Sequence, residues 1–358
     1  MIQTRRTSPP LATADLDEIF TSTRHLWKQM RGQKLFLTGG TGFFGAWLVE
    51  SFLYINQALA LDAEVTVLSR DPNAFINRLP HLRGHVGLAF HQGDVRDFVF
   101  PEGDFRFILH AATEASARQQ AEQPHEMLST ILTGMERVLS FAVQAHAEKF
   151  LFTSSGAVYG KQPEHISHIA EDYPGAPDPL LTASVYGEGK RAAELMCGLA
   201  ASELLQIKVA RCFAFIGPHL PLDTHFAAGN FLREAIAGRD ITIASDGSTL
   251  RSYLYASEMT AWLWTILFQA PSKRAYNVGS EEALSIEGLA AIVAGETVPP
   301  VSINVMTAPD KDAVALRYVP STARAQSELG LRQKVSVKES VRRTLAWHRL
   351  ESTNITVE

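Results

Sequence analysis

A glycine-rich stretch near the N-terminus constrains the fold of this 358-residue chain more than any other feature. It reads Thr38-Gly39-Gly40-Thr41-Gly42-Phe43-Phe44-Gly45, and it separates the short apolar run 34–37 from the amphipathic run 46–53. This pattern predicts a strand, a tight turn and a helix. Glycines spaced three apart let the backbone approach a pyrophosphate, and the N–H groups at the helix start supply an anion site. We therefore predict a dinucleotide-binding turn, with cofactor contacts from Gly39, Gly42, Phe43, Phe44 and Gly45.

Beyond this turn, strand and helix patterns alternate. Strands are expected at 64–70, 87–90, 105–109 and 149–152, and a helix is expected over 126–145. Such alternation is typical of a parallel, doubly wound sheet that carries helices on both faces. The sequence therefore predicts an α/β fold of the Rossmann-like type. An amphipathic helix over 15–30 precedes the first strand as an extension, and it packs either on its own subunit or on a second copy.

Composition narrows the class of protein. The chain is 46% hydrophobic and 20% charged with a net charge of −5, which is ordinary for a soluble enzyme and gives no basic block for nucleic acid or anionic membranes. No apolar run approaches the length of a membrane span, and no residues show the spacing of a metal site. Cys197 and Cys212 lie in apolar segments and are expected to be buried thiols, which suits a reducing compartment. We expect a cytoplasmic protein without a metal.

The tip of the second strand selects the cofactor in a dinucleotide fold. An acidic residue there binds the ribose of NAD, whereas an arginine accommodates the 2′-phosphate of NADP. Ser69 and Arg70 occupy this tip, so NADP is favoured while NAD stays open. Asp94 is expected to meet the adenine amino group, and the small residues after the strand 105–109 are expected to lie against the cofactor backbone. The further cofactor contacts are predicted to be Ser69, Arg70, Asp94, Val95, Ala111, Ala112, Thr113, Thr153, Tyr186 and Lys190.

A second set of residues carries chemistry. Ser155 follows the strand 149–152, at the carboxyl end where open α/β sheets place their ligands. Tyr186 and Lys190 are four residues apart at the start of a helix, so both side chains project from one face. A lysine beside a phenol stabilises the phenolate, so we expect Lys190 to lower the pKa of Tyr186 toward neutrality. Such a tyrosine serves as a general base on a hydroxyl or a general acid on a carbonyl, while Ser155 holds the same oxygen.

Together these motifs resemble the extended short-chain dehydrogenase/reductase superfamily, in its nucleotide-sugar epimerase/dehydratase branch. The resemblance covers about residues 34 to 345 and rests on 38–45, Gly93-Asp94, 110–112, 154–160, Tyr186 with Lys190, 211–218 and 246–253. It implies NAD or NADP as cofactor, Tyr186 as the catalytic base, Lys190 as a ligand of the nicotinamide ribose and Ser155 as a ligand of the reacting sugar oxygen. It also implies a homodimer.

The resemblance divides the chain and assigns its second half to a nucleotide-diphosphate sugar. The implied parts are an extension over 1–33, a dinucleotide-binding domain over 34–218, a smaller mixed α/β substrate lobe over 219–350 from which 254–270 packs back on the first domain, and a tail over 351–358. The implied substrate ligands are Ser154, Ser155, Asn230, Arg251 and Arg317. The two arginines suit a diphosphate, which attracts guanidinium groups.

The two residues after Ser155 help to distinguish among the reactions of this branch. By this resemblance, dehydratases of the branch have Asp and Glu at the positions that Gly156 and Ala157 occupy here. Decarboxylases have Glu at the position of Ala157. Neither Gly nor Ala transfers a proton, so the resemblance favours a 4-epimerase that acts by transient oxidation. The alternative is an NADPH-dependent reductase of a 4-keto nucleotide sugar. A 4,6-dehydratase or a non-catalytic dinucleotide-binding protein is disfavoured.

Overall fold

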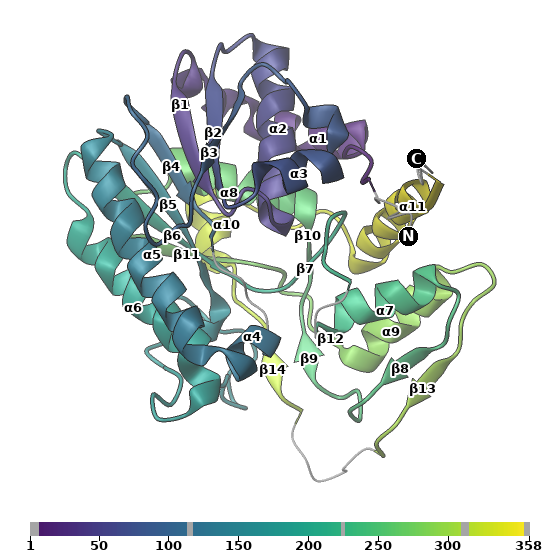
Figure 1. Ribbon diagram of the computed structural model, residues 1–358. Helices are drawn as coiled ribbons and strands as arrows, with labels where there is room; N and C mark the ends of the chain where they lie inside the picture. Colours follow the sequence, from purple (N-terminus) through teal and green to yellow (C-terminus); the bar gives the residue numbers. More distant parts are fainter. Residues whose placement is uncertain (1–6, 113–116, 223–225, 309–314, 354–358) are drawn as a thin grey trace.

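A seven-stranded parallel sheet forms the centre of the computed structural model, which describes residues 7–112, 117–222, 226–308 and 315–353 (Figure 1). In spatial order its strands are β11 (Arg274–Val278), β6 (Gln206–Cys212), β5 (Lys149–Ser155), β4 (Phe107–His110), β1 (Lys34–Thr38), β2 (Glu64–Ser69) and β3 (Leu88–Gln92). The chain runs from β1 outward to β3 and then returns to the other side of β1 as β4. This reversal places a crevice at the carboxyl ends of β1 and β4, where doubly wound sheets bind ligands. The predicted fold class is confirmed.

Helices cover both faces of this sheet. Apolar side chains of α2 (Phe43–Leu59) and α8 (Ala256–Gln269) join one core, and those of α5 (Pro124–Gln144) and α6 (Val185–Ala200) join the other. The strands are buried on both sides, which is why they read as continuous apolar runs. Helix α8 is buried along nearly its whole length and contacts α2, β5 and β6. The segment 254–270, which the resemblance implies packs back on the first domain, therefore lies against the large sheet.

The second half of the chain adds a smaller lobe. Its core lies among α7 (Ala227–Ile236), α9 (Ile286–Gly295) and α11 (Val337–Thr353). Two short parallel strands, β8 (Ile241–Ile243) and β13 (Ile303–Val305), lie beside α9. A mixed sheet of β12 (Leu284–Ser285), β9 (Leu250–Arg251) and β14 (Arg317–Tyr318) lies between this lobe and the large sheet in Figure 1.

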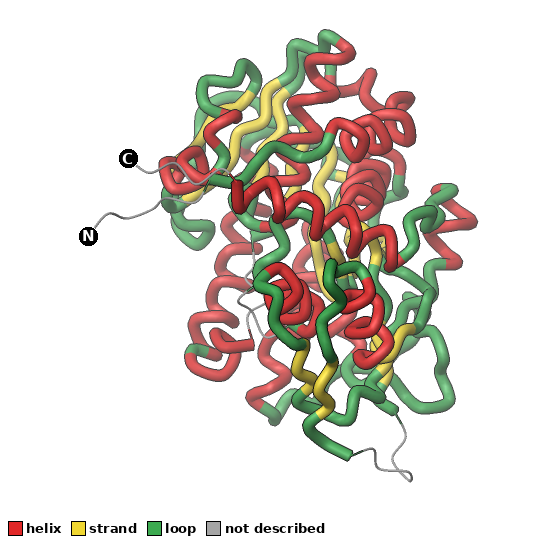
Figure 2. The backbone as a smooth tube through the Cα atoms, turned by 90° about the vertical axis from the view of Figure 1, so that its right-hand side faces the viewer, coloured by secondary structure: helices red, strands yellow, loops and turns green. Residues whose placement is uncertain are grey.

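The N-terminal extension packs on its own chain. The helix expected over 15–30 is α1 (Thr13–Thr23) followed by a 3₁₀ helix, Arg24–Met30. Trp27 is fully buried, with its ring centroid 5.0 Å from that of Trp264 in α8. The segment before α1 reaches α11, where the Ser8 hydroxyl donates to Glu351 at 2.7 Å, so the first and last described segments of the chain lie side by side (Figure 2).

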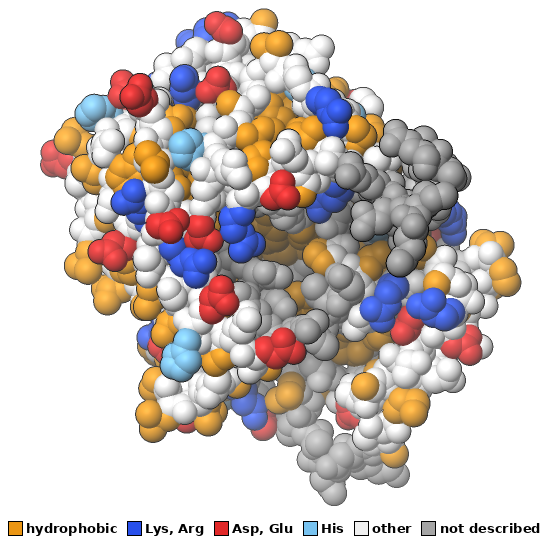
Figure 3. All heavy atoms as spheres, viewed as in Figure 1, with side chains coloured by type: hydrophobic (Ala, Val, Ile, Leu, Met, Phe, Trp, Pro, Cys, Tyr) orange, Lys and Arg blue, Asp and Glu red, His pale blue; other side chains and the backbone are white. Residues whose placement is uncertain are grey.

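Charged side chains of both signs are interspersed on the face drawn in Figure 3, and no block of one sign stands out there. Cys197 and Cys212 are both buried and free, as predicted. In the described part of the chain, no helix has the length and apolar character that a membrane crossing requires.

Candidate active site

The glycine turn has the geometry that a dinucleotide needs. Gly39 has a φ of +71°, and a Cβ there would lie 2.5 Å from the carbonyl of Ala111. A Cβ at Gly45 would overlap backbone atoms of Gly40, so this position also has to be glycine. At Gly42, the residue before α2, the nearest neighbour of a Cβ would be the Gly39 oxygen at 3.5 Å. Two glycines therefore close the turn, and the third leaves room at the N-terminus of α2 for a phosphate.

Across the turn, the end of β4 is tied to the end of β1. The Ala111 amide donates to the Thr38 carbonyl at 3.1 Å, and the Ala112 amide lies 3.2 Å from the Thr38 hydroxyl. His110 Nδ1 lies 2.7 Å from the same hydroxyl, and burial lowers the pKa of His110 to about 3, with the Lys190 charge acting in the same direction. His110 is therefore a neutral structural residue. Thr113, the last predicted contact of this group, lies outside the described residues.

The tips of β2 and β3 carry the residues predicted to meet the adenosine half. Arg70 is exposed, and its charge helps to lower the pKa of Asp94, although the hydrogen bond from Arg96 contributes more. Arg96 donates to the Asp94 carboxylate from Nε at 2.8 Å and from Nη2 at 3.1 Å. Ser69 is buried, and its hydroxyl accepts from the Asp71 amide at 3.2 Å. Val95 is also buried, next to Gly134 of α5, so its side chain faces the core.

The structure brings the three predicted catalytic residues together at the junction of β5 and α6. Ser155 ends β5, its hydroxyl accepts from the Ala157 amide at 3.1 Å, and its side chain lies beside the Tyr186 phenol. Lys190 Nζ donates to the Thr153 carbonyl at 2.8 Å and lies 5.8 Å from the centroid of the Tyr186 ring. Serine, tyrosine and lysine therefore form one group, as their order along the chain predicted.

The predicted lowering of the Tyr186 pKa is wrong for the protein without cofactor. Burial raises the pKa of Tyr186 above its ordinary value, and the hydrogen bond with Ser155 opposes this only in part. Burial lowers the pKa of Lys190 to about 8. The lysine ammonium donates to the Thr153 carbonyl and lies 4.6 Å from the Phe152 ring centroid, and burial keeps the pKa of Tyr186 raised.

Ser154 faces away from this group. Side chains alternate across a strand, so Ser154 lies on the opposite face of β5 from Thr153 and Ser155. Its hydroxyl donates to Glu194 at 2.6 Å, and Glu194 in turn pairs with Arg211 at 2.7 Å. The structure therefore does not place Ser154 with the other predicted substrate ligands.

The predicted ligands of the diphosphate lie in the second lobe. Asn230 is a partly buried residue of α7. In the β9–β14 pair, Arg251 lies opposite Tyr318 and Leu250 lies opposite Arg317. Partners across a ladder share a face and successive residues alternate, so Arg251 and Arg317 lie on opposite faces of this pair. The register does not bring the two arginines together.

Two aromatic residues that the sequence did not single out complete the site. A Cβ at Gly156 would lie 2.7 Å from the Tyr318 hydroxyl and 2.7 Å from the edge of the Phe213 ring. The two rings pack on each other with centroids 4.7 Å apart. These side chains therefore occupy the space that an acidic side chain at position 156 would need. No local pattern marks them, because they reach the site through tertiary packing.

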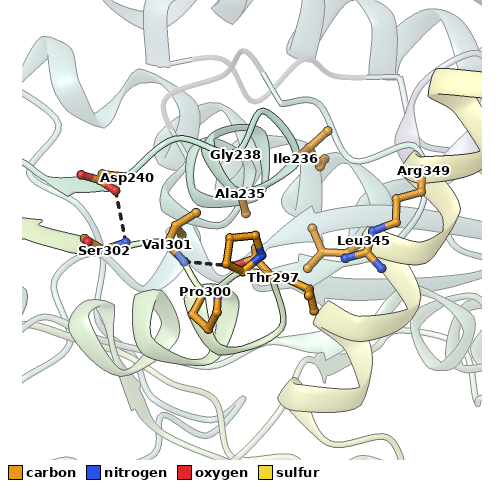
Figure 4. A pocket seen from close by; sticks show the side chains of 12 residues that line it. Ala235, Ile236, Gly238, Asp240, Thr297, Pro300, Val301, Ser302, Leu345 and Arg349 are labelled. Atoms are coloured by element: carbon orange, nitrogen blue, oxygen red, sulfur yellow. Dashed lines mark hydrogen bonds between the residues drawn. The ribbon is translucent and has the colours of Figure 1, made fainter.

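A separate cavity of about 330 Å³ lies within the second lobe (Figure 4). The end of α7, the loop 297–302 and α11 surround it, and Arg349 and Leu345 lie on its α11 side. No predicted site residue lines this cavity, so it does not belong to the chemistry described above.

Comparison with known proteins supports the resemblance drawn from the motifs. UDP-glucuronic acid decarboxylase 6 of Arabidopsis thaliana is 28% identical over 312 residues, which cover 86% of each chain. The structure of UDP-glucose 4-epimerase from Thermus thermophilus, solved with NAD, matches with a TM-score of 0.71 and 26% identity over 88% of this chain and 99% of that one. UDP-N-acetylglucosamine 4-epimerase from Methanobrevibacter ruminantium shares the fold, with a TM-score of 0.75 and 19% identity over 90% of this chain and 100% of that one.

The family model itself matches most of the chain. It spans residues 35–279, from the first strand and the glycine turn to the end of β11. This range includes Ser155, Tyr186 and Lys190, so the match covers the group described above. The protein therefore belongs to the NAD dependent epimerase/dehydratase family.

Proposed function

We propose that this enzyme inverts the C4 centre of a nucleotide-diphosphate sugar by transient oxidation. At the coarser level, it is an NAD-dependent nucleotide-sugar-modifying enzyme. One observation carries the finer proposal: Ser155, Tyr186 and Lys190 lie together, while the positions beside them, Gly156 and Ala157, hold no acid. This set can move a proton at one carbinol oxygen and lacks a group that would eliminate water.

Different residues of the chain bind the cofactor, transfer the proton and hold the reacting oxygen. Bound NAD supplies the acceptor and donor of hydride at C4. The open side of Gly42 and the N-terminus of α2 hold the pyrophosphate, because the first N–H groups of a helix have no partner within the helix and no side chain caps them at Gly42. Tyr186 removes the proton of the C4 hydroxyl and returns it after the 4-keto sugar has presented its opposite face, while Ser155 holds the same oxygen by a hydrogen bond.

The cofactor and the alternative reactions follow from the same geometry. Arg70 is exposed beside Asp94, where it can reach a 2′-phosphate, and this supports NADP and the 4-keto reductase as the second candidate. Dehydration is disfavoured because Phe213 and Tyr318 fill the space next to Gly156. The names of the sequence relatives add decarboxylation as a reaction to test, because oxidation of a hexuronate at C4 gives a β-keto acid that loses CO₂.

One experiment separates these reactions. The purified protein is denatured, its released nucleotides are identified by mass spectrometry, and fresh protein with NAD is incubated with UDP-glucose, UDP-N-acetylglucosamine and UDP-glucuronic acid. A product of unchanged mass with an inverted C4 centre supports the proposal. Loss of water or CO₂ replaces it with dehydration or decarboxylation, and turnover that requires NADPH and a 4-keto sugar replaces it with the reductase. Absence of turnover with all of these sugars contradicts a UDP-sugar substrate.

The lowered pKa of Lys190 predicts a fall in activity at alkaline pH. Burial lowers this pKa to about 8, so the ammonium is charged below that pH and loses its proton as the pH rises through it. The charged form assists a phenolate at Tyr186, so kcat/KM is expected to fall above pH 8. Steady-state rates across pH 6 to 10 measure this effect. The Lys190→Arg variant is the control, because arginine keeps its charge and removes the alkaline fall. A wild-type profile that stays flat to pH 10 contradicts the assignment.

We also propose a homodimer that forms through α5 and α6. Leu195 and Leu199 are 66% and 78% exposed and lie one helical turn apart on α6, and Val143 near the end of α5 is 67% exposed. Apolar side chains exposed at this spacing suit a helix-to-helix contact with a second copy. Light scattering after size exclusion is expected to give the mass of a dimer, and Leu195→Glu with Leu199→Glu is expected to give a monomer. A wild-type monomer contradicts the proposal.

A further inference from the structure

A second phenol lies at the catalytic serine. The Tyr318 hydroxyl lies 2.7 Å from where a Cβ of Gly156, the residue after Ser155, would be, and both Tyr318 and Tyr186 lie beside the Ser155 side chain. Tyr318 comes from β14 in the second half of the chain, whereas Tyr186 comes from α6. The serine at the end of β5 therefore lies between two tyrosines from different parts of the fold.

The position of the Tyr318 side chain is fixed on three sides. Its ring packs on Phe213 with centroids 4.7 Å apart, and the guanidinium carbon of Arg251 lies 5.3 Å from the ring centroid. Its hydroxyl lies 2.7 Å from where a Cβ of residue 156 would be, so a side chain at that position would crowd it. Burial raises the pKa of Tyr318 to about 12, so this phenol keeps its proton at neutral pH.

The number of hydrogen bonds that Ser155 can make determines which of the three hydroxyl groups donates and which accepts. A serine hydroxyl donates one hydrogen bond and accepts two. It already accepts from the Ala157 amide at 3.1 Å, which leaves one acceptor position and one proton for two phenols. A phenolate at Tyr186 can only accept, so it takes the serine proton, and Tyr318 then fills the last acceptor position as a donor. With sugar bound, the same arrangement points the serine proton at the reacting oxygen.

We propose that Tyr318 is a positioning residue that donates to Ser155 and thereby directs the one serine proton, toward Tyr186 before the sugar binds and toward the reacting oxygen once it is bound. This role rests on the proposed function, since it serves proton transfer at one sugar oxygen. This role explains why residue 156 is a glycine in this chain, because a side chain there would displace the Tyr318 phenol. The other ionisable groups that interact with Tyr186 or Tyr318, among the described residues, are Lys190 of α6, Cys212 of β6 and Arg251 of β9.

The Tyr318→Phe variant tests this role because it keeps the ring and removes only the hydroxyl. Loss of one neutral hydrogen bond is expected to lower kcat about tenfold, with KM little changed. In the NAD-bound enzyme the pKa of Tyr186 is expected to rise, because Ser155 no longer has a fixed direction, so the pH at which the rate begins to rise moves upward. Tyr276→Phe is the matched control: its hydroxyl bonds Glu328 at 2.7 Å, away from the site, and its loss leaves the pH profile unchanged.

Two further measurements keep the test decisive. In a Ser155→Ala background, Tyr318→Phe is expected to have no further effect on kcat, because the role acts through the serine. Ultraviolet difference titration of the NAD-bound protein against NAD-bound Tyr186→Phe reports the Tyr186 pKa without any turnover, so it tests the role even if the sugar chemistry proposed above fails. An unchanged Tyr186 pKa in Tyr318→Phe, or additive losses in the double variant, overturns the inference.

Discussion

Tyr186→Phe is expected to lower kcat by about 10² to 10⁴-fold, which is the usual contribution of one positioned acid–base group. The change removes one oxygen atom, and the phenyl ring keeps its packing against the core that α5 and α6 share. Thermal stability and NAD binding are therefore expected to stay close to those of the unchanged protein. The measurement combines single-turnover rates with titration of NAD by calorimetry, so that proton transfer is separated from cofactor binding.

The control for this variant is Tyr54→Phe. Tyr54 lies on α2, and its phenol donates to Asp17 at the surface, so the same atom is lost without touching the group at Ser155. Its kcat is expected to equal that of the unchanged protein. Turnover of Tyr186→Phe at a rate near that of the control would show that another group transfers the proton. A parallel loss of NAD binding would instead assign Tyr186 to the cofactor site.

The parts of the fold that depend on local sequence were predictable. The apolar run before the glycines became β1, which extends one residue further to Thr38, and the helix expected over 126–145 is α5. The grouping of Ser155, Tyr186 and Lys190 also followed from local rules, because one residue ends a strand and the other two share a helix face. Short-range geometry fixes each of these features.

The parts that depend on tertiary contacts were not predictable. Whether the pKa of Tyr186 is lowered depends on how deeply the phenol is buried in the folded protein, and here burial raises it. The separation of Arg251 from Arg317 depends on the register of two strands of two residues each, which no sequence period reveals. Tyr318 joins the site across a long stretch of chain, so only the folded structure places its hydroxyl beside Gly156. Sequence patterns predict which side chains belong to a site, whereas tertiary packing determines which atoms those side chains contact.

Gly45→Ala is expected to lose NAD binding together with stability. A Cβ at this position overlaps the backbone of Gly40, which has no side chain that could move aside, so the turn itself has to shift. Forcing an extra carbon into packed structure costs about 1–3 kcal/mol in the free energy of unfolding. The shift also moves the N–H groups at the start of α2 out of line with a phosphate. Chemical denaturation and NAD titration on the same sample measure the two losses.

Gly42→Ala separates binding from stability, which Gly45→Ala cannot do alone. At Gly42 φ is −84°, which alanine adopts, and the nearest atom to a Cβ would be the Gly39 oxygen at 3.5 Å. The free energy of unfolding is therefore expected to change by at most about 1 kcal/mol, the order of a helix N-cap effect. NAD affinity is expected to fall sharply, because the methyl group stands where the pyrophosphate approaches the backbone. If Gly42→Ala bound NAD as tightly as the unchanged protein, the cofactor would not lie on this turn, and the helix N-terminus would be only a structural junction.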